Sequence, residues 1–82
     1  MFYVYFIKSK KKAGQFYTGY SSDLKKRLTE HNSGNSQFTR MYKPWKLIYS
    51  EKYKDQGEAI KREKYLKSAA GRRWMKKNIF NS

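Results

Sequence analysis

The sequence predicts an α/β (α+β) fold, with a small, mainly antiparallel three-stranded sheet flanked by helices. A run of aromatic and β-branched residues at 2–7 is followed by a second run at 15–20, across a basic turn that contains Gly14. A third run of this type occurs at 45–50. Segments with helical spacing and capping signals separate and follow these runs. Such a pattern favours one layer of sheet covered by helices.

The first two runs predict an antiparallel hairpin whose loop is centred near Lys11 or Lys12. With that centre, Tyr5 and Tyr17 lie roughly opposite each other and share one face of the sheet. The two phenols then converge on one site. The alternative is that the two tyrosines are ordinary strand residues with no shared site, because tyrosine is common in strands.

A first helix is predicted over residues 23–32, with Ser21 or Ser22 as its N-cap. Leu24 and Leu28 mark its buried side.

Arg27 and His31 are one turn apart on a neighbouring face of this helix. Residues at this spacing are close enough to act together on one phosphate. A solvated basic surface is the alternative interpretation.

The rest of the chain supplies a polar loop at 34–43, the third strand at 45–50 and a second helix at about 58–68. The third strand is central or lies next to the hairpin. A short basic helix from 72 to about 79 is expected after Gly71.

Glu63 lies at helical spacing between Ala59 and the pair Leu66 and Ala70. An unpartnered carboxylate on a buried stripe costs several kcal/mol, so such a residue usually holds a cation or a proton. The alternative is a glutamate at the edge of the stripe, paired with one of the many lysines.

The charge indicates a polyanionic partner. Twenty Lys and Arg residues against six Asp and Glu give a net charge of +14 in 82 residues. Nucleic acid is the expected partner, with a membrane surface or an acidic protein as alternatives. The cations are interleaved with fifteen aromatic residues (eight Tyr, two Trp and five Phe), which favours a folded basic surface over a disordered tail.

Length and composition limit the number of domains, the membrane segments and the cofactors that can be expected. We expect one domain over residues 1–82, without a membrane span or signal peptide, in the cytoplasm. The chain has no cysteine and one histidine, so a metal must be held by carboxylate, backbone and water oxygens, which suits Mg²⁺ or Mn²⁺. No glycine-rich phosphate loop is present, so no nucleotide cofactor is expected.

The chain resembles the GIY-YIG nuclease family, and in particular its small single-domain members related to the nuclease domain of the bacterial excision-repair endonuclease. The matching motifs are colinear and cover nearly the whole chain: Tyr3-Val4-Tyr5, Tyr17-Thr18-Gly19, residues 22–28 and 30–32, Phe38-Thr39-Arg40, Pro44 and residues 58–63. The first motif lacks its glycine, where Tyr3 stands, and Thr18 replaces isoleucine.

This resemblance implies a metal-dependent phosphodiesterase that cuts DNA by attack of water on phosphorus. Tyr5 and Tyr17 are then the motif tyrosines, Arg27 the phosphate-binding arginine, His31 the adjacent histidine and Glu63 the ligand of a single Mg²⁺ or Mn²⁺. The motifs do not tell which tyrosine acts on the water.

Further site or DNA-contacting residues are expected more loosely: Asn78, Thr39, Arg40, Lys25, Lys26 and Lys67. So small a module implies weak sequence preference, and it leaves structure-selective cutting, low-affinity nicking and recruitment by a protein partner as alternatives. The family resemblance suggests a role in DNA repair or recombination. The oligomeric state is open. Two other classes compete, a non-catalytic nucleic-acid-binding module of the same fold and a basic protein that docks on an acidic one.

Overall fold

The strand β1 (Phe2–Ser9) is the centre of the computed structural model, which describes residues 1–35, 37 and 39–80. The strands β2 (Phe16–Ser21) and β3 (Trp45–Tyr53) pair with it on either side, both antiparallel, in the order β2-β1-β3. The predicted fold class is confirmed. The third strand lies next to the hairpin and not at the centre, and it continues beyond residue 50.

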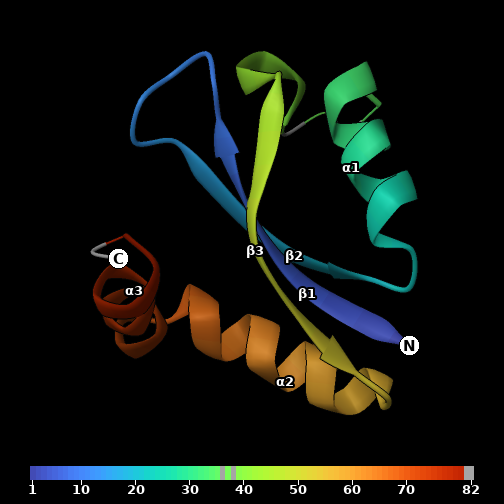
Figure 1. The fold of residues 1–82 in the computed structure, drawn as a ribbon, viewed down its shortest axis with the longest axis vertical. Helices are drawn as coiled ribbons and strands as arrows, with labels where there is room; N and C mark the ends of the chain where they lie inside the picture. Colours follow the sequence, from blue (N-terminus) through green and yellow to red (C-terminus); the bar gives the residue numbers. More distant parts are fainter. Residues whose placement is uncertain (36, 38, 81–82) are drawn as a thin grey trace.

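Helices cover both faces of the sheet (Figure 1). They are α1 (Leu24–Ser33), α2 (Gln56–Lys67) and α3 (Ala69–Met75), with a short 3-10 turn η1 (Arg40–Tyr42) and a π-helical segment η2 (Lys76–Phe80). The helix α1 packs on one face, and α2 and α3 pack on the other. Phe38, which belongs to one of the matching motifs, lies outside the described residues.

The central strand is buried on both faces. Val4 and Phe6 face α2 and α3, whereas Tyr5 and Ile7 face α1, and none of the four is more than 3% exposed. A strand covered on both sides reads as a continuous apolar run instead of an alternating one. This is the reason for the unbroken run at the start of the chain.

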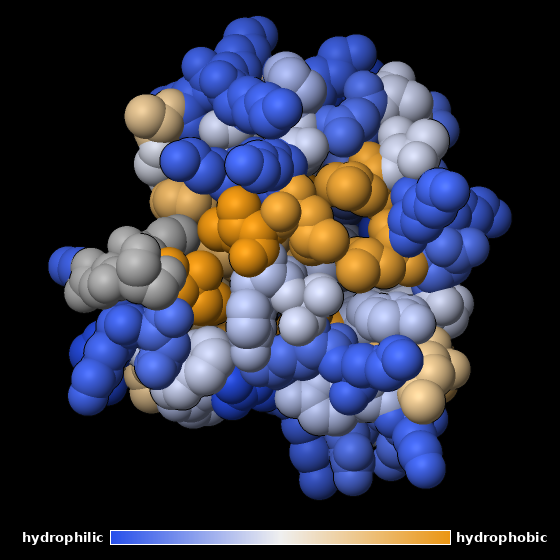
Figure 2. Space-filling model, in the orientation of Figure 1, coloured by the Kyte–Doolittle hydropathy of each residue, from blue (hydrophilic) through white to orange (hydrophobic). Residues whose placement is uncertain are grey.

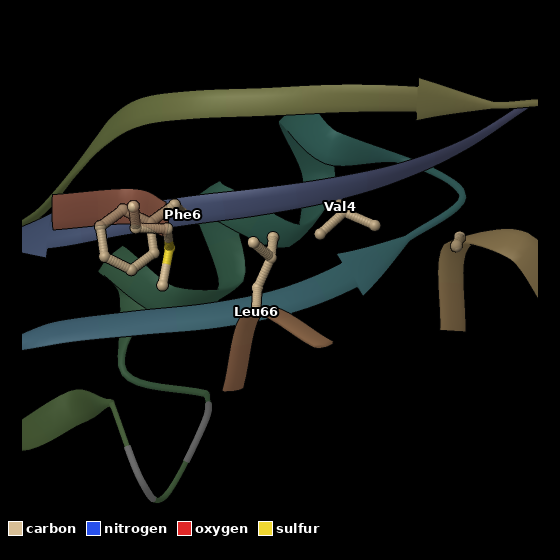
Figure 3. Close-up of a cluster of buried hydrophobic side chains, with 5 residues drawn as sticks. Val4, Phe6 and Leu66 are labelled. Carbon is tan, nitrogen blue, oxygen red and sulfur yellow. The ribbon is translucent and has the colours of Figure 1, made fainter. Parts of the chain in front are cut away.

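The core on the α2 side is apolar. In Figure 3, Leu66 rises from α2 toward Val4 and Phe6 of β1. Ala59 and Met75 complete this cluster, and each of its members is at most 4% exposed. Burial of a large apolar side chain contributes about 1.5–3 kcal/mol, so this contact fixes α2 on the sheet.

Side-chain caps set the ends of the first two helices. The Asp23 carboxylate accepts from the Lys26 amide at 3.0 Å and caps α1, while Asp55 caps α2. The predicted Ser21 or Ser22 cap is therefore wrong, since the Ser21 hydroxyl instead bonds to the backbone of Asp23. Gly34, at φ 87°, ends α1 in the left-handed conformation.

Gly71 does not separate two helices as predicted but lies inside α3, which begins at Ala69. The residue is buried, and a Cβ on it would lie 1.9 Å from the Tyr65 carbonyl oxygen and 2.5 Å from Leu66 Cα. Only a residue without a side chain lets α3 turn back this closely against the end of α2.

The surface is strongly polar. Figure 2 shows hydrophilic side chains around most of the outline, with an apolar band across the middle of the face in view. Mean hydropathy is −1.09. Across the described residues, the helices are too short or too polar to cross a bilayer.

We predict that Gly71→Ala lowers the free energy of unfolding by more than about 2 kcal/mol, because the methyl group overlaps backbone atoms that cannot move aside. Gly57→Ala is the matched control. A Cβ at Gly57 meets nothing closer than 3.5 Å, and alanine favours a helix by up to about 1 kcal/mol over glycine. Urea unfolding measures both, and equal stability of the two variants contradicts the close packing at Gly71.

Candidate active site

The two motif tyrosines lie on the face of the sheet that packs against α1. Tyr5 is paired with Gly19, and Tyr17 with Ile7, so the phenols are diagonal neighbours with ring centroids 6.4 Å apart. Of the two predicted loop centres, Lys11 and Lys12, the pairing selects Lys12, so the tyrosines are diagonal and not directly opposed. The expected convergence on one face is nevertheless present, since diagonal positions share a face.

Gly19 makes room for the Tyr5 ring. A Cβ at Gly19 would lie 2.5 Å from the Tyr5 hydroxyl oxygen and 2.7 Å from Tyr5 Cζ. The Tyr5 side chain therefore crosses the backbone of β2 at the one position without a side chain. The close approach of the Tyr5 ring explains why the second motif ends in glycine in this chain.

The helix α1 supplies Arg27 and His31. Arg27 Nε donates a long hydrogen bond of 3.4 Å to the Tyr5 hydroxyl, and His31 Nε2 lies 2.9 Å from the same oxygen. His31 is fully buried, whereas the Arg27 side chain is 33% exposed. The solvated-surface interpretation is thus wrong for His31, which joins α1 to the central strand.

The donors and acceptors around His31 favour one of its two neutral tautomers. Arg27 can only donate, so the Tyr5 oxygen accepts from it and points its own proton at Nε2 of His31. Nε2 is then the unprotonated nitrogen, and Nδ1–H donates to Thr39 Oγ1 at 2.7 Å. In that arrangement the buried side-chain nitrogen and oxygen atoms of Tyr5, His31 and Thr39 all have hydrogen-bond partners.

Thr39 and its neighbours hold this network in place. Thr39 is fully buried, and its carbonyl accepts from Trp45 Nε1 at 2.8 Å. The Asn32 side-chain amide bonds to both the N–H and the C=O of Trp45. The end of α1 and the start of β3 thereby fix the buried threonine, for which the motifs suggested only a backbone or phosphate contact.

Burial keeps both buried groups uncharged near neutral pH. It raises the pKa of Tyr5 to about 12 against the opposing effect of Arg27. It also lowers the pKa of His31 to about 4, and the nearby Arg27 charge lowers it further. Tyr5 and His31 therefore form a neutral, hydrogen-bonded pair behind Arg27.

Glu63 reaches the same region from α2. Its side chain is 16% exposed, its Oε2 lies 3.7 Å from Lys67 Nζ, and its charge is one of those that raise the pKa of Tyr5. Lys67 Nζ in turn lies 5.8 Å from the centre of the Tyr17 ring. Ala70 is exposed and lies beyond the end of α2, so the predicted four-residue stripe is wrong in that member.

Glu63 suits a cation that takes most of its ligands from elsewhere. Within the described part of the chain, no three His, Cys, Asp or Glu side chains form a metal-binding group. Mg²⁺ and similar ions are commonly held by one or two carboxylates together with waters and substrate phosphate oxygens. The single, largely buried Glu63 carboxylate fits that pattern and does not fit a dedicated all-protein cage.

Five of the six more loosely expected residues, including Lys67, are exposed, and Thr39 is buried. Lys25, Lys26 and Arg40 are exposed. Asn78 is also exposed, and its amide donates to the Trp74 carbonyl at 2.8 Å within the same helical segment. This bond directs the Asn78 amide to its own helical segment and not to Tyr5 or Arg27.

A second polar cluster was missed by the motifs. Glu51 on β3 accepts from Arg62 Nε at 2.8 Å, from Tyr53 at 2.7 Å and from Tyr49. Burial alone raises the pKa of Glu51, but these hydrogen bonds outweigh it and hold the pKa below its usual value. Arg62 also lies 4.6 Å from the Trp74 ring centre. The period-two spacing of the three strand residues signals a shared face, but nothing local points to Arg62.

The fold and the site together define a small α+β domain with phenol, guanidinium, imidazole and carboxylate groups gathered beside the edge strand β2. The chain belongs to the GIY-YIG family, a family of nucleases, because the model of the GIY-YIG catalytic domain matches residues 1–78. The resemblance indicated by the motifs is thereby confirmed.

Its relatives are similarly small. A UPF0213 protein of Staphylococcus saprophyticus is 36% identical over 75 residues, which cover 90% of this chain and 89% of the relative. One from Staphylococcus epidermidis is 37% identical over 67 residues, covering 80% and 79%. The solution NMR structure of a UPF0213 protein from Bacillus halodurans superposes with a TM-score of 0.54 at 30% identity, covering 92% of this chain and 82% of that one.

We predict that stability falls as the pH drops from about 6.5 to about 4. In this range the unfolded chain protonates its single histidine while buried His31 stays neutral, so folding is disfavoured, by at most about 3 kcal/mol, and the effect levels off below pH 4. Urea unfolding of the native chain and of His31→Gln isolates the effect. The imidazole NMR signals of His31 report its titration directly, and a midpoint near 6.5 contradicts the buried neutral pair.

Proposed function

We propose that this chain is a divalent-metal-dependent DNA endonuclease that hydrolyses phosphodiester bonds with weak sequence preference. The observation that carries the proposal is a series of contacts that links three elements of a chain with a net charge of +14. Arg27 of α1 bonds to Tyr5, whose ring lies 6.4 Å from that of Tyr17 on β2. Lys67 lies beside the Tyr17 ring and 3.7 Å from Glu63 of α2. Membership of a nuclease family supports the same conclusion.

Arg27 is the phosphate-binding residue in this proposal. Its Nε is directed at Tyr5, and its Nη1 lies 3.7 Å from the exposed carboxylate of Glu30, so the outer part of the guanidinium remains partly open to solvent. A planar, always charged group held in this way can donate to the non-bridging oxygens of a phosphate. The bond to Tyr5 fixes its orientation, which favours stabilisation of the added charge in the transition state.

Tyr17 is the phenol that acts on the attacking water. Tyr5 is 2% exposed and its hydroxyl is engaged with Arg27 and His31, so no water reaches it without a rearrangement. Tyr17 is only partly buried, and Lys67 lies beside its ring. In this step Tyr17 acts as the phenolate, after releasing its own proton to solvent, and it orients the water and receives one of its protons. The water oxygen bonds to phosphorus as the bond from phosphorus to the leaving oxygen breaks, and solvent then protonates the leaving oxygen.

Glu63 would hold Mg²⁺ or Mn²⁺, with the other ligands supplied by waters and the substrate phosphate. When bound, such an ion acts as a Lewis acid and offsets the negative charge that forms on the leaving oxygen. Lys67 Nζ, 3.7 Å from Glu63 Oε2, pairs with this carboxylate in the absence of an ion. We further propose that the enzyme works in the cytoplasm in DNA repair or recombination, recruited to its sites by a protein partner.

We predict that Glu63→Gln lowers metal-dependent nicking of supercoiled plasmid by at least about 100-fold while DNA binding is kept, because the carboxylate acts on the transition state. Glu58→Gln is the matched control, since Glu58 is exposed in the first turn of the same helix and should keep full activity. Binding without cutting by the native chain, with either metal, indicates the non-catalytic module instead.

We predict that removing the hydroxyl group has different effects at the two tyrosines, on activity at Tyr17 and on stability at Tyr5. Tyr17→Phe should reduce cleavage by at least about 100-fold with little change in the unfolding free energy. Tyr5→Phe should cost about 1–3 kcal/mol of stability, because it leaves His31 Nε2 without its donor. Cleavage assays and urea unfolding of both variants test this, and full activity of Tyr17→Phe refutes the assignment.

A further inference from the structure

A groove lies on the far side of Tyr17 from the buried pair. It has a volume of about 870 Å³ and runs between β2 on one side and α2 and α3 on the other. Its floor is apolar and includes Phe16, Leu66 and Met75, with the Tyr17 ring at one end. The dimensions are those of pockets that hold small organic groups.

The opposite wall of this groove is cationic. Lys67, Arg72 and Lys76 line it from α2, α3 and η2, and all three are exposed. The described residues that line the groove include no aspartate or glutamate. Charge therefore favours an anionic occupant, and the apolar floor favours one with a flat or hydrophobic part.

The groove is continuous with the candidate active site. Tyr17 and Lys67 belong to both, and Lys67 Nζ is 3.7 Å from Glu63. A DNA strand with one phosphate at Arg27 and Glu63 therefore has its neighbouring nucleotides at the mouth of the groove.

We infer that the groove takes unpaired nucleotides of the DNA strand that is cut, with a base on the apolar floor and the adjoining phosphates against Lys67, Arg72 and Lys76. A base inside a duplex is stacked and paired and does not enter such a groove. Aromatic floors beside cationic walls are the usual means of binding single strands, because each base has a π face and each nucleotide a phosphate. The inference rests on the proposed nuclease function and names its substrate class, DNA with a single-stranded segment at the cut.

The test measures binding in EDTA, so that it does not depend on cleavage. Arg72→Gln with Lys76→Gln should weaken binding to a single-stranded oligonucleotide at least about tenfold more than binding to the duplex of the same sequence. Arg73→Gln with Lys77→Gln is the matched control, because it removes the same charge from exposed neighbours that do not line the groove. The control pair should weaken both ligands to the same small extent.

A second arm leaves the protein unchanged. Single abasic sites placed along the strand of a flapped DNA should weaken binding by about 5-fold or more at one or two positions beside the cut, and not elsewhere. A uniform response to the abasic sites, or equal losses for single strand and duplex in the groove pair, overturns the inference and assigns these cations to general attraction of DNA. If the native chain shows the groove effects but cuts no DNA with Mg²⁺ or Mn²⁺, the groove stands and the nuclease proposal fails. If the native chain cuts DNA but shows none of these binding effects, the nuclease proposal stands and the groove inference fails.

Discussion

Burial of β1 on both faces is the constraint on which the rest of the structure depends. Val4 and Phe6 require an apolar cover on one side, which α2 and α3 supply, and Tyr5 and Ile7 require one on the other, which α1 supplies. A chain of 82 residues has room for little more than these two contacts. Tyr5 is both a core residue and a member of the candidate site. The packing of the core and the placement of the site's polar groups therefore depend on each other.

The polar network inside the α1 face follows from that double role. A buried phenol and a buried imidazole each cost free energy unless their hydrogen bonds are made, and here Tyr5, His31 and Thr39 satisfy one another. Asn32 and Trp45 hold the threonine from outside. The result is a neutral, hydrogen-bonded support that holds the Arg27 side chain through the Tyr5 hydroxyl.

The acidic residues are few and each has a defined place. They are Asp23 and Asp55 at the helix N-caps, Glu58 in the first turn of α2, Glu30 beside Arg27, Glu51 beneath Arg62, and Glu63 beside Lys67. Glu51 and Arg62 join β3 to α2, the helix that carries Glu63. With the acids used in this way, most of the positive charge is left on the surface, where it attracts a polyanion.

Local patterns in the sequence determined the strands, the helices, the shared face of the two tyrosines and the partly buried position of Glu63 on its helix, since periodicity and caps act over a few residues. Tertiary structure alone decided the register that opposes Tyr5 to Gly19, and the burial of His31 against Thr39. It also decided the position of Gly71 inside α3. These features depend on contacts between segments far apart in the chain, and local preference differs little between neighbouring registers or helix starts, so the packing of distant segments decides between them.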